Sequence, residues 1–167
     1  MANPRQGSLA GTETPGTDSE AAAAETGGQP RVWALLGDKA GDNSQVLALS
    51  RALGWPFVTK QLAYRPLRKL PNLLFGASLV TLDRQKSDAL EPPWPDLVIG
   101  VGRRSVPVAR WIRRQAGART RLVQIGRPRA PVSLFDLVVT TPQYGAALAP
   151  NVIELPLPIA LLHRFFM

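Results

Sequence analysis

The chain has 167 residues, no cysteine and one histidine, His163, and this composition excludes a disulfide framework, a thiolate metal site and a histidine-rich metal cluster. The length fits one domain with a tail, or one lobe of something larger, and it allows a buried core. Lysine and arginine number 20 against 12 acidic residues, and residues 31–167 alone hold 19 basic and 8 acidic residues. A body of this charge attracts phosphates, nucleic acid or anionic lipid, and an ordinary solvated surface is the alternative.

Residues 1–30 consist mainly of glycine, alanine, serine, threonine, proline and glutamate, with almost nothing large and apolar. Such a segment buries too little surface to offset the entropy of ordering, so we expect a disordered tail over 1–30 and a folded lobe over 31–167. The start lacks the apolar stretch of a secretory signal, and no window reaches the apolar length of a membrane span. We therefore expect a cytoplasmic protein, with a peripheral position at the inner membrane as the alternative.

The first ordered unit is organised around the polar stretch Gly37–Gln45. An apolar run, Val32–Leu36, precedes it and an amphipathic pattern follows over 46–53, which indicates a strand, a glycine loop and a helix. Free N–H groups in the first helical turn and the helix dipole favour an anion in such a loop. Gly37 and Gly41 would let a ligand approach the backbone closely.

The same stretch also fits a well-capped turn that binds nothing, in which Asp42, Asn43 or Ser44 caps the helix. Asp38 and Asp42 bring negative charge to the loop. The loop therefore suits a general base, or acceptors for sugar hydroxyls, better than it suits a bare phosphate. The sequence leaves both interpretations open.

A second strand is expected over 57–62, and the apolar spacing of Leu70–Leu82 predicts a helix. This helix is apolar on so much of its circumference that we expect it to be buried, with contact to a membrane or a partner as the alternative. A basic cluster precedes it and would supply the contact with anionic lipid: Arg65, Arg68 and Lys69.

The second half of the chain alternates strands with helices. The unbroken apolar run Leu97–Val101 is typical of a central parallel strand covered on both faces, and further strands are expected over 121–126, 137–141 and 151–155. This alternation predicts an α/β fold with a doubly wound parallel sheet of five or six strands, a Rossmann-like lobe. We expect Val32–Leu36 and Leu97–Val101 to be central, and adjacent or one apart.

The pattern after Leu97–Val101 predicts a helix with Ser105 as its N-cap and Pro107 in its first turn. Its apolar residues form an inner face. Three arginines, Arg110, Arg113 and Arg114, are expected to face outward.

Four polar loops follow strands of this sheet and should meet at its carboxyl edge: 37–45, 100–105, 126–129 and 140–144. Arginine contacts phosphate or carboxylate groups bidentately, so arginines in these loops are candidate anion clamps, with solvated or salt-bridged side chains as the alternative. The predicted ligand-binding residues are Gly37, Gly41, Asn43, Gln45, Gly100, Gly102, Arg103, Arg104, Ser105, Arg127 and Gln143.

The sequence lacks the motifs of several well-known binding and catalytic sites. The stretch Gly100–Ser105 is close to a dinucleotide fingerprint, but Ser105 stands where the third glycine belongs and the strand is a late one. Neither a phosphate-binding Gly-x-x-x-x-Gly-Lys-Ser/Thr loop, nor a Gly-x-Ser-x-Gly elbow, nor metal-ligand spacing occurs. The basic residues lack interleaved aromatic residues, so nucleic acid is not an expected partner. We expect no metal and no cofactor.

Four motifs in order carry a resemblance to a known family: Gly37–Gln45, Leu97–Ser105, Gln124–Pro128, and Phe135–Val139 with Thr141–Tyr144. Over about 32–152 the chain resembles the family named after a plant mitochondrial-fission factor. Its bacterial members look like GT-B glycosyltransferases, in which two Rossmann-like lobes face a cleft. The resemblance implies that this chain is the amino-terminal, acceptor-side lobe. The second lobe would then be absent, as in a truncated product.

The resemblance also implies a nucleotide-sugar donor and a hydroxyl-bearing or phosphorylated acceptor. Asp38 or Asp42 would then act as the catalytic base toward the acceptor hydroxyl, and the isolated chain would be inactive. The alternative is a non-catalytic binding or scaffold module of the mitochondrial fission factor-like family, associated with membrane processes, in which the loops are only architecture.

Overall fold

The computed structural model describes residues 28–65, 76–145 and 149–165, and within them it shows six parallel strands in one sheet. The strands are β1 (Val32–Leu36), β2 (Phe57–Gln61), β3 (Leu97–Val101), β4 (Arg121–Ile125), β5 (Leu137–Thr140) and β6 (Val152–Glu154). Three α-helices, α2 (Ala40–Ala52), α4 (Gly102–Gln115) and α5 (Ile159–Phe165), accompany two 3-10 turns, η1 (Val132–Leu134) and η2 (Pro142–Tyr144).

The strand order is β2-β1-β3-β4-β5-β6, which confirms the predicted α/β fold with a parallel sheet. Strands β1 and β3 lie side by side in the interior of the sheet, with Val32 opposite Leu97. Every residue of β1 is buried, because this strand is covered on both faces. The unbroken apolar runs therefore identified the two central strands correctly.

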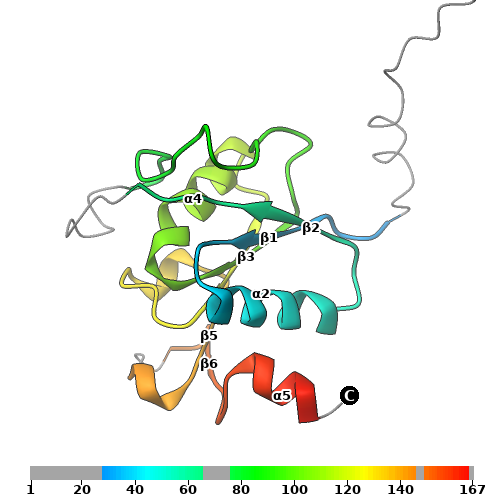
Figure 1. The fold of residues 1–167 in the computed structure, drawn as a ribbon, viewed down its shortest axis with the longest axis vertical. Coiled ribbons are helices and arrows are strands. Elements are labelled where there is room, and N and C mark those ends of the chain that lie inside the picture. Colours follow the sequence, from blue (N-terminus) through cyan, green and yellow to red (C-terminus); the bar gives the residue numbers. More distant parts are fainter. Residues whose placement is uncertain (1–27, 66–75, 146–148, 166–167) are drawn as a thin grey trace, which may run out of the picture.

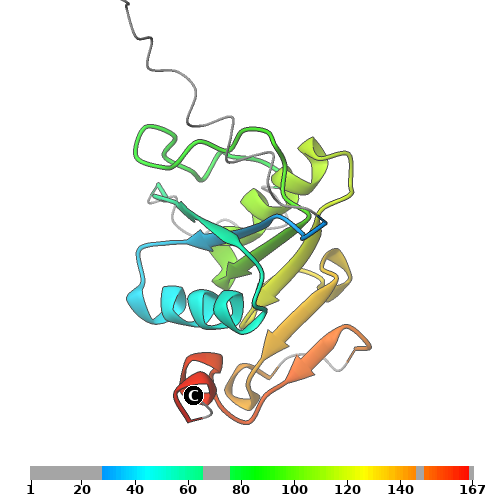
Figure 2. The ribbon, with the colours of Figure 1, turned by 90° about the vertical axis from the view of Figure 1, so that its right-hand side faces the viewer.

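Helices cover both faces of the sheet (Figure 1). On one face α4 contributes Val106, Val108 and Ile112 to a core that includes Trp33 and Leu35 of β1. On the opposite face α2 and α5 pack over the alternate residues of β1. Figure 2 shows α5 beside α2, and the two helices are in contact. Parallel strands with helical connections bring the loops after β1, β3, β4 and β5 to one edge of the sheet.

The predicted helix over Leu70–Leu82 is wrong for the part that the structure describes. Residues 76–82 form turns and bends, and Leu82 makes an antiparallel bridge with Tyr64. Gly76 has a φ of +54°, which a regular helix does not accommodate. Leu79 and Leu82 nevertheless pack on the core. Their apolar spacing therefore indicated burial correctly, but not a helix. The remainder of this prediction, with Arg68 and Lys69, lies outside the described residues, as does nearly all of the predicted tail.

The predicted start of α4 is also wrong. The helix begins at Gly102 with Val101 as its N-cap, and Pro107 lies inside the helix beyond the first turn. Gly102 has a φ of +64°, so the chain turns directly from β3 into the helix without a polar cap. The Ser105 hydroxyl donates back to the carbonyls of Val101 at 3.0 Å and Gly102 at 3.1 Å.

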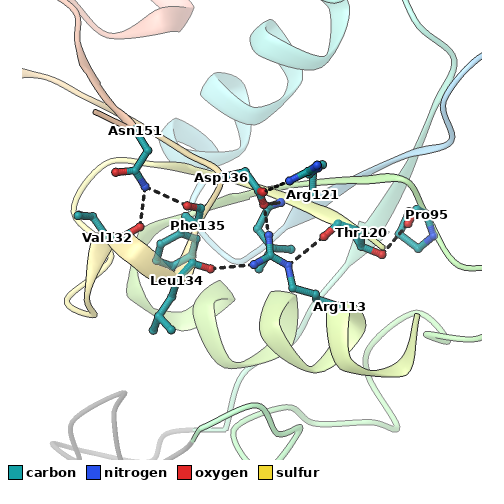
Figure 3. Close-up of polar contacts among 10 residues, drawn as sticks. Pro95, Arg113, Thr120, Arg121, Val132, Leu134, Phe135, Asp136 and Asn151 are labelled. Atoms are coloured by element: carbon teal, nitrogen blue, oxygen red, sulfur yellow. Dashed lines mark hydrogen bonds and ion pairs between the residues drawn. The ribbon is translucent and has the colours of Figure 1, made fainter. Parts of the chain in front are cut away.

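A polar network ties α4 to the amino edge of the sheet (Figure 3). The Asp136 carboxylate pairs with Arg113, accepts a hydrogen bond from Arg121 at 2.8 Å and accepts another from the backbone N–H of Leu122 at 2.8 Å. Arg113 also donates to the carbonyls of Thr120 at 2.9 Å and Leu134 at 3.2 Å. The prediction that Arg113 faces outward is therefore wrong, because Asp136, 23 residues away in sequence, draws it in.

Candidate functional site

The loop between β1 and α2 is closed by Asn43. Its side chain accepts a hydrogen bond from the Gly37 N–H at 2.8 Å and donates to the Gly37 carbonyl at 2.9 Å. The helix begins at Ala40 with Lys39 as N-cap, and no side chain makes a capping hydrogen bond. The caps considered for Asp42, Asn43 and Ser44 are therefore not formed. Asn43 instead fixes the turn that presents Asp38 and Asp42.

A packed junction between β3, α4 and β4 explains part of the Gly100–Ser105 motif. A Cβ atom at Gly100 would lie 2.9 Å from the Ser105 hydroxyl oxygen and 3.3 Å from Oε1 of Gln124. The fully buried Gln124 side chain donates to the Gly102 carbonyl at 2.8 Å. The junction leaves no room for a side chain at Gly100, which accounts for the glycine without a ligand. Its role in ligand binding stays a prediction.

The carboxylate hollow lies between the loops after β1 and β3 and has a volume of about 160 Å³. Its central feature is an ion pair between Asp38 and Arg104, with Oδ2 and Nη1 3.0 Å apart. Both side chains are exposed, which leaves the pair accessible to a ligand. The lining residues are Leu35, Gly37, Asp38, Lys39, Asp42, Tyr64, Val101, Gly102, Arg103, Arg104 and Ser105.

Tyr64 completes this hollow from the segment after β2. The Arg104 guanidinium carbon lies 6.0 Å from the centre of the Tyr64 ring. Burial raises the pKa of the Tyr64 phenol well above its usual value; the Arg104 charge opposes this shift and the Asp38 charge adds to it. Tyr64 is therefore a neutral group that can exchange hydrogen bonds but cannot serve as a general base at neutral pH.

Sequence reasoning missed Tyr64, although a signal was present. The residue follows β2 by three positions, and β2 is parallel to β1, so the segment leaves the sheet at the carboxyl edge. The predicted site used the loops after four other strands. The segment after the predicted strand 57–62 was instead interpreted as a basic cluster followed by a helix, so Tyr64 was not among the predicted site residues.

The arginine hollow adjoins the carboxylate hollow and has a volume of about 410 Å³. Arg127 and Arg129 are exposed, and neither forms an ion pair with any residue that the structure describes. Arg129 has a φ of +51°, a conformation that costs energy for a residue other than glycine. The lining residues are Lys39, Asp42, Gln45, Val101, Gly102, Arg103, Ile125, Gly126, Arg127, Arg129, Gln143 and Tyr144.

An apolar hollow of about 720 Å³ continues from the arginine hollow. It is formed by the segment from Arg127 to Ser133, which leads from β4 to η1, together with Gly145 after η2. Ala130 and Val132 supply much of the apolar wall, and both also pack against the core.

The structure brings most of the predicted site residues to one edge of the sheet. These are Gly37, Asp38, Asp42, Gln45, Gly102, Arg103, Arg104, Ser105, Arg127 and Gln143. Gly41, Asn43 and Gly100 do not line these hollows. Arg65 is exposed beyond β2. The ligand-binding and catalytic roles of all these residues stay predictions.

Two further features of the described residues bear on metal binding and on membrane crossing. No three His, Cys, Asp or Glu side chains among them are grouped so as to hold a metal ion. None of their helices combines the length and the apolar character that a membrane crossing requires.

Comparison with known sequences gives two matches. The sequence model of the family described as mitochondrial fission ELM1 matches residues 40–158. The chain is also 30% identical over 109 residues to "Uncharacterized protein RP120" of Rickettsia prowazekii, strain Madrid E. That alignment covers 65% of this chain but only 30% of the relative, so the chain corresponds to less than a third of the relative's length.

Proposed function

The chain belongs to the mitochondrial fission ELM1 family, and on this premise we propose that its carboxyl edge is the acceptor-side site of a GT-B-like glycosyltransferase that uses a nucleotide-sugar donor. The isolated chain is proposed to turn over little substrate, because in a GT-B enzyme a second lobe holds most of the donor. The full activity is therefore a proposal for longer relatives.

The observation that carries the proposal is the side-by-side placement of carboxylates and of arginines that form no ion pair within the described residues. Asp38 and Asp42 stand at the carboxylate hollow, whereas Arg127 and Arg129 stand at the arginine hollow next to it. A carboxylate can accept the proton of an acceptor hydroxyl, and arginines can hold a neighbouring phosphate. A site for a bare anion would need only the arginines and not the carboxylates.

In the proposed reaction Asp38 or Asp42 takes the proton from the acceptor hydroxyl as its oxygen bonds to the anomeric carbon of the donor sugar. The bond from that carbon to the nucleoside diphosphate breaks, and the nucleotide leaves with the electron pair. Tyr64, neutral through burial, supplies a hydrogen bond to the acceptor rather than a base.

The test is a transfer assay on a full-length relative with a panel of nucleotide sugars. Replacing the residues that match Asp38 and Asp42 by asparagine should lower kcat about 100-fold or more, the usual contribution of a general base. The melting temperature should change little, because Asp38 is exposed and its pair with Arg104 is accessible to water. A matched control is Glu154→Gln on β6, which is exposed and lies outside all three hollows. Full activity of both asparagine variants would refute the catalytic role.

A non-catalytic scaffold is the second candidate, and one observation favours it. Asn43, Ser105 and Gln124 use their polar groups on nearby backbone, as expected of architectural loops. Calorimetry with a full-length relative separates the two functions. The scaffold predicts that no nucleotide sugar binds, whereas the transferase predicts binding even when the first-loop aspartates are replaced.

We also propose a peripheral contact with anionic membrane through Arg65, Arg68 and Lys69. Arg65 is exposed, and each basic residue near an anionic surface contributes about 1 kcal/mol. Flotation with anionic liposomes tests it: replacing all three by alanine should reduce the bound fraction. Equal flotation of wild type and variant would refute the proposed contact.

A further inference from the structure

Three hollows follow one another along the carboxyl edge. The carboxylate hollow and the arginine hollow share Lys39, Asp42, Val101, Gly102 and Arg103. The arginine hollow and the apolar hollow share Arg127 and Arg129. The shared walls make the hollows consecutive, with the arginine hollow in the middle.

The chemistry changes along this series. The carboxylate hollow is lined by two acidic residues, Asp38 and Asp42, and by three basic ones, Lys39, Arg103 and Arg104. In the arginine hollow Asp42 is the sole acidic lining residue, against Lys39, Arg103, Arg127 and Arg129. The excess of basic over acidic side chains is therefore largest in the middle of the series, where an anionic group would be most stable.

The apolar hollow has a different lining. Proline, alanine and valine from the segment Pro128–Val132 form most of its wall, and its charged groups are the two arginines at the junction with the arginine hollow. A polar or ionic ligand would lose hydration there without new hydrogen bonds, whereas an alkyl chain would gain from burial. The two arginines at the mouth would hold a charged group at the end of that chain.

We propose that the acceptor of this site is a phosphate-bearing amphiphile. Its alkyl chain lies in the apolar hollow, its phosphate contacts Arg127 and Arg129, and a hydroxyl-bearing head reaches Asp38 and Asp42. The assignment of the head as acceptor rests on the proposed transferase function. The binding of the chain and phosphate does not, because it uses only the arginine and apolar hollows.

The test measures binding to the 167-residue chain by calorimetry, with three probes below their micelle concentrations: octyl phosphate, inorganic phosphate and octyl glucoside. Octyl phosphate should bind at least about tenfold more tightly than inorganic phosphate, since burying two methylene groups already changes a binding constant by that factor. It should also bind at least about tenfold more tightly than octyl glucoside, because the glucoside has the same chain but offers no charged group to Arg127 and Arg129. In a series of ethyl, butyl and octyl phosphates, affinity should rise with chain length. In NMR spectra of the chain, octyl phosphate should shift mainly the backbone amide signals of the segment 127–133 and of Gly145.

The matched variants separate a local site from overall charge. Arg127→Gln with Arg129→Gln should weaken octyl phosphate at least about tenfold, because bidentate contacts to phosphate are lost. Arg51→Gln with Arg84→Gln removes the same charge from exposed positions outside the three hollows and should have little effect.

Two results would overturn the proposal. Equal affinity for octyl and inorganic phosphate would show a site for free phosphate without a chain. Equal affinity for octyl phosphate and octyl glucoside, unchanged in the Arg127/Arg129 variant, would show apolar adsorption alone. Octyl phosphate binding as expected, together with a full-length relative that transfers no sugar, would refute the transferase and keep the amphiphile site.

Discussion

The two edges of the sheet use arginine in opposite ways, although Arg104 and Arg113 belong to the same helix, α4. At the amino edge Arg113 is half-buried and engaged by Asp136 and two carbonyls. At the carboxyl edge Arg104 makes an exposed pair with Asp38, and Arg127 pairs with no described residue. An arginine whose donors are satisfied inside the chain stabilises the fold, whereas one left at a hollow is available to a ligand.

The largest effect that sharpens this contrast is expected at Asp136. Asp136→Ala removes the partner of Arg113 and the acceptor of the Leu122 N–H, and should lower the free energy of unfolding by about 2–3 kcal/mol. Urea denaturation measures this. The same change at the carboxyl edge, Asp38→Ala, should cost about 1 kcal/mol or less, because both partners are exposed. Equal losses at the two positions would remove the distinction between the edges.

Two glycines at the carboxyl edge differ in the space around them: Gly100 lies in a packed junction, whereas Gly41 faces open space. Gly100→Ala would bring Cβ within 2.9 Å of the Ser105 hydroxyl oxygen and should cost about 1–3 kcal/mol. Gly41, in α2, has nothing within 4 Å of a built Cβ, so Gly41→Ala should stabilise the helix by about 0.5–1 kcal/mol. The measurement is again urea denaturation, and a stable Gly100→Ala variant would show that the junction yields easily.

Much of the fold could be predicted from the sequence because its cause is local. The central strands β1 and β3 are apolar runs bounded by polar residues and glycine, and a parallel sheet then sends the following loops to one edge. The convergence of Asp38, Arg104 and Arg127 on one region of the surface follows from this topology alone.

The rest depends on contacts between residues far apart in the chain. Arg113 turns inward because of Asp136, 23 residues away, and periodicity does not reveal this contact. Nor does it reveal the crowding at Gly100, which comes first from Ser105 and then from Gln124 on the neighbouring strand. The start of α4 depended on the positive φ of Gly102 rather than on a polar cap. Residues 76–82 bury leucines without forming a helix, because spacing alone does not distinguish a helix from a packed loop.

Tyr64 at the carboxyl edge has a pKa shifted by burial, and the resulting pH dependence can be predicted. Burial raises the pKa of the phenol, so above about pH 10 the unfolded chain loses this proton while the folded chain keeps it. The folded state then binds more protons, and the free energy of unfolding falls as the pH rises. The Tyr64→Phe variant should lack this decline. Urea titrations between pH 8 and 11 measure it, and parallel profiles for both proteins would contradict the burial of the phenol.

The smallest effect is expected for the coupling between Asp38 and Arg104. The side chains are 63% and 46% exposed, so water and salt screen the pair, and a double-mutant cycle with Asp38→Asn and Arg104→Gln should give about 0.2–1 kcal/mol. The coupling should decrease further in high salt. A value above about 2 kcal/mol would place this pair with Asp136 and Arg113, as a bond that stabilises the fold. A weak coupling means instead that a ligand can separate the two groups at little cost, which the proposed site requires, since the acceptor hydroxyl must reach a carboxylate that now faces an arginine.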